Sequence, residues 1–330
     1  MSSILAARKL LWVFRWGIFL LACVFLWWQL RADKGMLALQ VLRGLPDDGR
    51  AMMLVASALV LVPVNWGIES WKWRRLVQRL EPLRPWRAFL ATVAGTSIGL
   101  VTPNRTGEFL GRVLFLKPGD RVRGGFATAL GSIAQFVITL LAGVTALVAL
   151  LATGHPLPWP EGWYSAALIS LTCLVAAGTL VLYLFPALMR GSILALPVLR
   201  RLERPSAVLN TFRRIELLEV LTWSALRYAV FTFQYLLLCE AFRIGVAPMT
   251  TMLVVPVIYL VATIVPTVLL TEIGVRGSAA LAFFTPLGAA PEGVLLATST
   301  LWAINLVLPA AVGGVVLVTA RIRAQGSDGP

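Results

Sequence analysis

The sequence TPNRTGEFLGR, residues 102–112, places a proline, two arginines and a glutamate directly behind the apolar run AFLATVAGTSIGLV, residues 88–101. A second short apolar piece, FLGRVLFL, overlaps its end at residues 109–116. Helices of about 8–12 residues are only about 12–18 Å long, which is too short to cross about 30 Å of hydrocarbon. The stretch is therefore either a loop in water or the polar tip of a re-entrant hairpin, residues 87–117, held at membrane depth.

The composition favours the membrane setting. Of the 330 residues, 58% are hydrophobic and 13% are charged, whereas a soluble domain carries about 25% charged residues. The net charge of +14 comes from basic residues that cluster between apolar segments, which suits loops beside anionic lipid better than nucleic acid. We expect an all-α polytopic membrane protein, one membrane domain over residues 1–330, without a nucleic-acid partner. No metal or cofactor is expected, because the three cysteines lack CxxC spacing and there is one histidine.

Hydropathy predicts six transmembrane helices and two hairpins. The second hairpin, residues 248–287, resembles the first, because an apolar limb runs into Pro266 and the polar segment TEIGVRG, residues 271–277, before another short apolar limb. Irregular backbone at membrane depth is tolerated only where protein or a wet cavity surrounds it. The six runs long enough to span are residues 10–30, 51–71, 125–152, 164–189, 217–242 and 293–320.

The lysines and arginines predict the orientation. With the N-terminus in the cytoplasm, the outer segments hold Arg31, Lys34, Arg43, Arg50 and Arg243. Cytoplasmic segments carry the excess of basic residues, so we expect both termini in the cytoplasm and a location in the bacterial cytoplasmic (inner) membrane. The basic residues then assigned to the cytoplasmic side are Arg8, Lys9, Lys72, Arg74, Arg75, Arg79, Arg84, Arg87, Lys117, Arg121, Arg123, Arg190, Arg200, Arg201, Arg204, Arg213, Arg214, Arg321 and Arg323.

The two hairpins occupy equivalent places in two units of opposite orientation. Residues 51–152 form a first unit of span, hairpin and span, and residues 217–320 repeat that order. Inverted repeats of this kind are typical of secondary transporters. Residues 1–50 would supply a first helix and an outer surface segment, and residues 153–216 a connecting helix and a basic cytoplasmic linker.

The hairpin tips share their chemistry. Glu108 and Arg112 stand one helical turn apart, as do Glu272 and Arg276. The proline of each tip ends the descending limb, and a glycine allows the return. Glu108 would lie in the first turn of the returning helix, where free N–H groups favour an anion. Arg105 would then be free to bind a phosphate. The predicted substrate-binding residues are Asn104, Arg105, Gly107, Glu108, Arg112, Glu272, Gly274 and Arg276, and the hairpin breaks are Pro103 and Pro266.

A purely structural role is the alternative for these charges. The Glu–Arg pairs would then only neutralise each other and fasten the tips, because charge is costly at the bilayer centre. Pairs across the hairpins, Glu108 with Arg276 and Glu272 with Arg112, are a further alternative. Other polar residues inside the spans are either supporting site residues or hydrogen-bonding contacts between helices. The supporting candidates are Asn65, Glu69, Gln135 and Arg227, and the helix-contact candidates are Gln234, Glu240 and Asn305. Glu69 lies near the inner end of its span, so an interfacial anchor with Lys72 or Trp73 is the alternative to a site residue there.

Residues of both tips resemble a known family, the transmembrane (flippase-like) domain of lysylphosphatidylglycerol synthase. The matching features are WKWRRL at residues 71–76, the pattern Pro103-x-Arg105-x-Gly107-Glu108 with Arg112, and the late Gly274-Val275-Arg276. The resemblance covers residues 50–320 and implies a helical membrane fold with re-entrant helices and movement of lipids between leaflets. The family's late motif has paired glycines before G-x-R-E, whereas Thr271 and Glu272 precede the glycine here.

Lipid translocation is the function that the sequence favours. An anionic or glycosylated phospholipid or a polyprenyl-phosphate-type lipid would pass its head group between the hairpins, and synthase activity is not expected. Membrane lipids with a phosphate head group are thus the expected partners. The sequence leaves open whether the protein also forms a homo-oligomer. Two alternatives remain, a membrane-embedded transferase acting on a lipid-linked substrate and a non-transporting scaffold subunit.

Overall fold

The structure is a computed structural model that describes residues 48–100, 102, 105–159, 162–264 and 269–319. The predicted first span 10–30, the outer surface segment before residue 48, and Pro103, Asn104 and Pro266 lie outside the described residues. In the described part every regular element is a helix, which confirms the all-α fold class.

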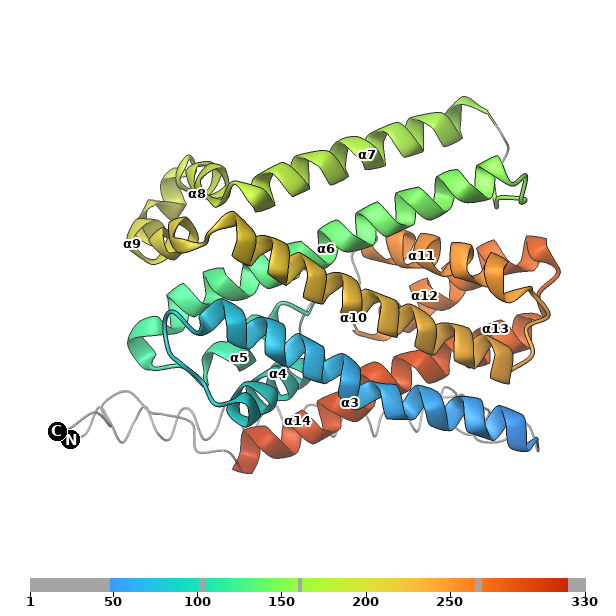
Figure 1. The fold of residues 1–330 in the computed structure, drawn as a ribbon, viewed down its shortest axis with the longest axis horizontal. Coiled ribbons are helices and arrows are strands. Elements are labelled where there is room, and N and C mark those ends of the chain that lie inside the picture. The colour runs from blue at the N-terminus through green and yellow to red at the C-terminus, as the bar shows by residue number, and fades with distance from the viewer. Residues whose placement is uncertain (1–47, 101, 103–104, 160–161, 265–268, 320–330) are drawn as a thin grey trace.

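The helices follow the order of the sequence prediction closely (Figure 1). Each predicted hairpin appears as a pair of consecutive helices between longer ones, with the first pair at residues 85–113 and the second at 248–284. The elements are α3 (Gly49–Val77), α4 (Pro85–Leu100), α5 (Gly107–Val113), η2 (Pro118–Asp120), α6 (Arg121–Ala152), α7 (Trp163–Leu184), α8 (Pro186–Leu194), η3 (Pro197–Leu202), α9 (Glu203–Ser206), η4 (Ala207–Thr211), α10 (Arg214–Ala241), α11 (Pro248–Ile264), α12 (Leu269–Phe284), η5 (Thr285–Leu287), α13 (Pro291–Trp302), the π-helical η6 (Ala303–Val307) and α14 (Leu308–Thr319).

Four helices of the described residues are long and apolar enough to cross a membrane. They are α3, the η2–α6 segment Pro118–Ala152, the α7 segment Ser165–Leu184, and the continuous segment Pro291–Thr319 formed by α13, η6 and α14. The fifth predicted span in this part, α10, has 28 residues but interrupts its apolar sequence with Arg227 and Gln234. The chain is therefore a multi-pass membrane protein, as its composition predicted.

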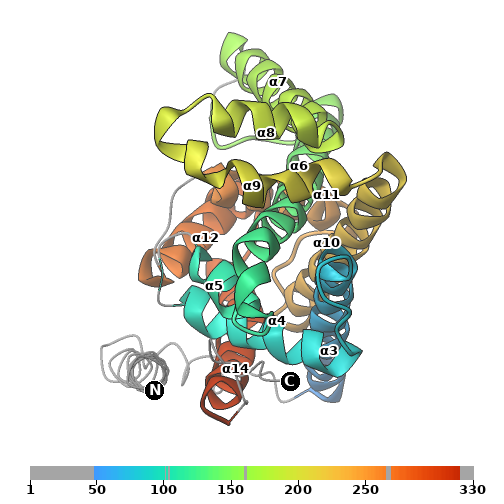
Figure 2. The same cartoon turned by 90° about the vertical axis from the view of Figure 1, so that its left-hand side faces the viewer.

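The two helix pairs lie toward opposite ends of the molecule. In Figure 1 the helices α3, α6, α7 and α10 run along the long axis, with α4 and α5 toward one end and α11 and α12 toward the other. The end view in Figure 2 shows α6 near the middle of the molecule, whereas α7 and α8 form one outer side. Helix α5 of the first pair and α11 of the second pair both pack against α6. The region predicted as a basic cytoplasmic linker, which ends at residue 216, contains the short helices α8, η3, α9 and η4.

Close packing of glycines joins α4 to α5. Gly95 and Gly99 of α4 face Gly107 and Gly111 of α5, so that each helix presents two glycines four residues apart. A Cβ atom built on Gly111 would lie 2.4 Å from the Cα of Gly95, and one on Gly107 would lie 2.5 Å from the carbonyl oxygen of Ile98. Such small residues let helix backbones approach closely where water is absent. Of these glycines, Gly107 was expected to permit a tight turn, but it packs against α4 instead.

The residue that adopts the turn conformation is Arg105, with φ of 57°. A non-glycine residue in this left-handed region is uncommon and costs free energy, which the surrounding contacts must offset. Arg105 lies directly before the start of α5, so this strained backbone conformation is located at the polar tip of the first hairpin.

Candidate functional site

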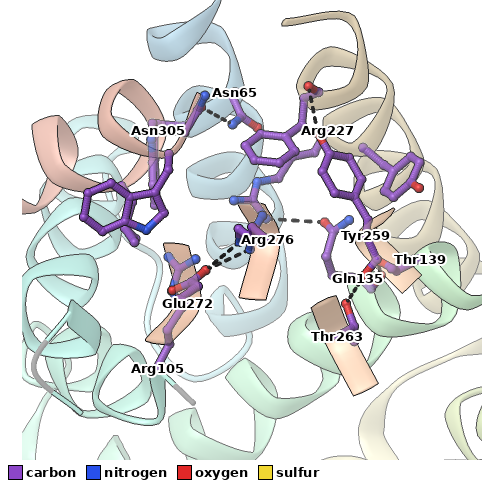
Figure 3. A pocket seen from close by; sticks show the side chains of 15 residues that line it. Asn65, Arg105, Gln135, Thr139, Arg227, Tyr259, Thr263, Glu272, Arg276 and Asn305 are labelled. Atoms are coloured by element: carbon purple, nitrogen blue, oxygen red, sulfur yellow. Dashed lines mark hydrogen bonds and ion pairs between the residues drawn. The ribbon is translucent and has the colours of Figure 1, made fainter. Parts of the chain in front are cut away.

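A polar cavity of about 210 Å³ lies in the interior between the two helix pairs (Figure 3). Its wall comes from α3, α6, α10, α11, α12, α13 and η6, together with the turn before α5. Three arginines and a single glutamate are its charged lining residues within the described part of the chain. The lining residues are Asn65, Trp66, Arg105, Gln135, Thr139, Arg227, Tyr228, Phe231, Tyr259, Thr263, Glu272, Arg276, Trp302, Asn305 and Leu306.

Glu69 of α3 is the centre of the ion pairs behind this cavity. Its carboxylate oxygens lie 2.7 Å from the Nζ atom of Lys72, 2.7 Å from Nη1 of Arg112 and 3.4 Å from Nη1 of Arg227. The side chains of Glu69 and Arg112 are each 6% exposed, and that of Lys72 is 1% exposed. Because buried charge is tolerated only when it is paired, this carboxylate holds three helices, α3, α5 and α10, in register.

The first hairpin tip extends this network toward the cavity. Glu108, in the first turn of α5, pairs with Arg112 at 3.2 Å, as the i, i+4 spacing predicted, and also with Arg105. Arg105 is therefore not the free cation that the sequence suggested, although its side chain does reach the cavity. The N–H of Gly107, expected at an anion site, donates instead to Oγ1 of Thr102 at 2.7 Å.

The second tip supplies the opposite wall. Glu272 lies in the first turn of α12 and pairs with Arg276, with its Oε1 atom 2.8 Å from Nη2 and 3.1 Å from Nε. Figure 3 shows Glu272 and Arg105 beside each other, and their charges interact across the gap between the two tips. The alternative pairs, Glu108 with Arg276 and Glu272 with Arg112, are not among the ion pairs of the described residues.

The cluster has a surplus of positive charge. Its ion pairs join five cations to three carboxylates, a formal sum of +2 over the part of the chain that the structure describes. Four of the five cations are guanidinium groups, which keep their charge at ordinary pH, so the cluster stays positively charged. The cations are Lys72, Arg105, Arg112, Arg227 and Arg276, and the carboxylates are Glu69, Glu108 and Glu272.

Hydrogen-bond donors also outnumber acceptors among the unpartnered lining atoms. Six buried polar atoms of the lining have no hydrogen-bond partner within the described protein, and one of them, Oδ1 of Asn65, can only accept. A cavity with surplus cations and surplus donors suits a ligand rich in anionic oxygen atoms. The other five atoms are Nε1 of Trp66 and Trp302, Nε of Arg105 and Arg227, and the hydroxyl group of Tyr228.

A pair of buried amides closes the cavity on the α3 side. Nδ2 of Asn65 donates to Oδ1 of Asn305 at 2.9 Å, and both residues line the cavity. Asn305 stands in the π-helical segment η6, where Leu308 donates to Ala303. Pro309 has no N–H to give to the Asn305 carbonyl, which interrupts the regular ladder at this place. Such π-helical turns often occur at functional sites.

Replacing Asn305 with leucine is expected to lower the free energy of unfolding by about 1–3 kcal/mol, because the Asn65 amide loses its buried acceptor. The double variant Asn65→Leu with Asn305→Leu should cost less than the sum of the two single changes. Unfolding titrations of the four proteins in mixed micelles form the required cycle. If the changes in the free energy of unfolding of the two single variants add up to that of the double variant, the hydrogen bond between Asn65 and Asn305 is contradicted.

The structure brings most of the predicted site residues into one network. Arg105, Glu272, Arg276, Gln135 and Arg227 line the cavity, with Nη1 of Arg227 donating to Oε1 of Gln135 at 3.4 Å. Four further predicted residues join the network, Asn65 as a lining residue and Glu69, Glu108 and Arg112 as ion-pair partners.

Three sequence-based assignments need correction. Gly274 is exposed with open space around it and is not a lining residue, and Gly107 packs against α4. Lys72 was predicted to follow the span that ends at residue 71, but α3 continues to Val77 and Lys72 is buried within it. Its position i+3 from Glu69 was the available signal. The hairpin arms also differ from the predicted lengths, since α5 has 7 residues and α12 has 16.

Sequence reasoning missed the aromatic part of the wall. On α10, Tyr228 follows Arg227 directly and Phe231 lies one turn after it, and both line the cavity. Tyr259 lines it from α11. The guanidinium carbon of Arg227 lies 5.6 Å from the centre of the Trp66 ring, a cation–π distance. Aromatic residues are common in apolar helices, so no sequence signal separated these from the packing residues.

Comparison with known proteins identifies a family for this chain. The family described as the lysylphosphatidylglycerol synthase TM region matches residues 8–314, which is most of the chain. Searches of curated proteins and of solved structures found no match. The chain therefore belongs to the lysylphosphatidylglycerol synthase TM region family, a family of membrane proteins related to lipid handling.

Proposed function

We propose that this protein moves an anionic lipid between the leaflets of the bacterial cytoplasmic membrane, with the head group held in the cavity between the hairpin tips. The observation that carries the proposal is the cavity itself, in which Arg105, Arg227 and Arg276 face the single carboxylate of Glu272. Charged residues in a membrane interior are costly and mark ion or substrate pathways. The acyl chains would remain in the bilayer while the head group passes.

The arrangement of helices supports an alternating mechanism. In the proposed topology both termini are cytoplasmic, the α4–α5 pair re-enters from the cytoplasm, and the α11–α12 pair re-enters from the outside. The two pairs then belong to inverted repeats, which in transporters meet at a binding site near the bilayer midplane. Their placement toward opposite ends of the long axis in Figure 1 fits this topology.

Flip of a tail-labelled anionic lipid in proteoliposomes tests the proposal. The double variant Arg105→Ala with Arg276→Ala should lower the rate at least about tenfold, because both changes remove charge from the proposed ligand cavity. Arg123→Ala is the matched control, since Arg123 pairs only at the surface, with Asp120 at 3.1 Å and a side chain 48% exposed. The assay is run with and without a pH gradient. Equal rates for wild type and the double variant would overturn the proposal.

A scaffold role is favoured by one specific observation, the buried ion pairs that fasten the first tip to α3. Reversing the pair Glu108–Arg112 cannot test it cleanly, because a glutamate at position 112 would face Glu69. The second tip allows the exchange Glu272→Arg with Arg276→Glu, which keeps the total charge. A scaffold should keep its stability and have no flip activity to lose, whereas a translocase should lose flip activity.

A further inference from the structure

We propose that the cavity selects a lipid whose head group is a phosphate monoester in its dianionic form, rather than a phosphodiester with a single negative charge. This inference rests on the proposed function and deepens it by naming the substrate class. The physical basis is the charge sum of +2 over the five cations and three carboxylates, of which Glu272 and Arg276 form a separate neutral pair and the other six form one connected set. A ligand of charge −2 neutralises that sum, whereas a diester leaves one buried positive charge uncompensated.

The cost of an uncompensated charge makes this difference matter. Both carboxylates behind the cavity are already committed, since Glu69 binds three cations and Glu108 binds Arg105 and Arg112. The described protein therefore offers no further anion to balance the surplus. Charge buried without a counter-charge is far less favourable than charge in a neutral set.

The unpartnered atoms of the lining point to the same head group. Five of the six are donors, on Trp66, Arg105, Arg227, Tyr228 and Trp302. A phosphate monoester presents three strong acceptor oxygens on one side, while a diester gives one of these positions to a second ester carbon. Trp66 is 3% exposed, so its indole N–H has little access to other partners outside the cavity.

Binding to the purified full chain in detergent separates the two head groups. The probes are dihexanoyl phosphatidic acid, a monoester, and dihexanoyl phosphatidylglycerol, a diester with the same acyl chains. At pH 7.5 the monoester should bind at least about tenfold more tightly. Between pH 7.5 and pH 5 its affinity should fall about tenfold, because the dianion loses population below its second pKa of about 6.

The diester serves as the control for the protein's own titration. It keeps one negative charge throughout this pH range, so the ratio of the two affinities reports the phosphate and not the cluster. The ratio cancels the titration of the groups that line the cavity or form ion pairs directly behind it. They are Glu69 and Lys72 of α3, Arg105, Glu108 and Arg112 of the first tip, Arg227 and Tyr228 of α10, Tyr259 of α11, and Glu272 and Arg276 of α12.

Gln135→Glu tests the charge count without removing a cation. The new carboxylate would lie beside Arg227, whose Nη1 is now 3.4 Å from Oε1 of Gln135, and it would lower the sum to +1. The monoester preference should then fall at least about tenfold, whereas Gln135→Met should keep it. The variant Arg227→Gln also lowers the charge sum to +1. Its control is Arg227→Lys, which keeps the positive charge. An unchanged preference in the folded variants would overturn the inference.

The remaining outcomes distinguish this inference from the proposed function. Equal, pH-independent affinity for both lipids would overturn monoester selection and leave lipid translocation standing. If neither lipid binds more tightly to wild type than to Arg105→Ala with Arg276→Ala, the site and both proposals fall. Inorganic phosphate, which shares the dianion but lacks acyl chains, should compete at least about 100-fold more weakly. If inorganic phosphate competed as strongly as phosphatidic acid, the conclusion that the bound phosphate belongs to a lipid would be overturned.

Discussion

Replacing Glu69 with glutamine is expected to lower the free energy of unfolding by about 3–5 kcal/mol, because the change leaves buried cations without their counter-charge. Lys72 and Arg112 are almost fully buried, and both lie 2.7 Å from the Glu69 carboxylate. Arg227 is the third cation on the same group. Unfolding of wild type and variant in mixed micelles, followed by circular dichroism, measures the difference.

The control for this change is Glu219→Gln in α10. Glu219 pairs with Arg75 at 2.8 Å, but both side chains are more than one third exposed, so its loss should cost less than about 1 kcal/mol. Adding Lys72→Met to the Glu69→Gln variant removes one of the stranded cations and should restore part of the stability. A Glu69→Gln protein as stable as the Glu219→Gln protein would contradict the central position of Glu69.

Replacing Gly111 with valine is expected to lower the free energy of unfolding by about 3 kcal/mol, near the upper end for overpacking, because the obstacle is backbone and not a flexible side chain. The new Cβ atom would lie 2.4 Å from the Cα of Gly95 and 2.9 Å from its nitrogen. Since α5 carries Glu108 and Arg112, separation of α5 from α4 should also lower lipid flip. The same unfolding titration and the flip assay give the two readouts.

Gly125→Val is the matched control. Gly125 lies in α6, and a Cβ atom built on it meets nothing within 4 Å, so the effect on stability should stay within about 0.5 kcal/mol. If the two valine variants were equally stable, the close contact of α4 with α5 would be excluded as the reason for the glycines. A loss of stability without loss of flip would separate the packing of α5 from the function.

Local sequence rules predicted the parts of the site that lie within one helix. The pairs Glu108–Arg112 and Glu272–Arg276 followed from i, i+4 spacing, and both appear in the structure with the glutamate in the first turn. The hairpin limits were also close, because prolines and polar residues mark helix ends along the chain. The position of the polar tips between apolar limbs was likewise readable from hydropathy.

Contacts between distant segments could not be read in this way. Glu69 looked as much like an interfacial anchor as a site residue, and its partners Arg112 and Arg227 come from two other helices. Lys72 was assigned to the cytoplasmic side with the other basic residues of WKWRRL, yet α3 continues through it and buries it. Helix rotation and approach decide such pairings, and these depend on packing against neighbours rather than on spacing along the chain.

The sequence by itself determined that this protein is a helical membrane protein with two polar breaks, because the bilayer imposes length and hydropathy rules on every segment. It also determined the family, through residues that lie at those breaks. Only the tertiary structure decided that the breaks share one cavity, that Glu69 joins three helices, and that cations outnumber carboxylates there. The physical reason is that an electrostatic balance is a property of groups brought together in space, and no single segment of the chain contains it.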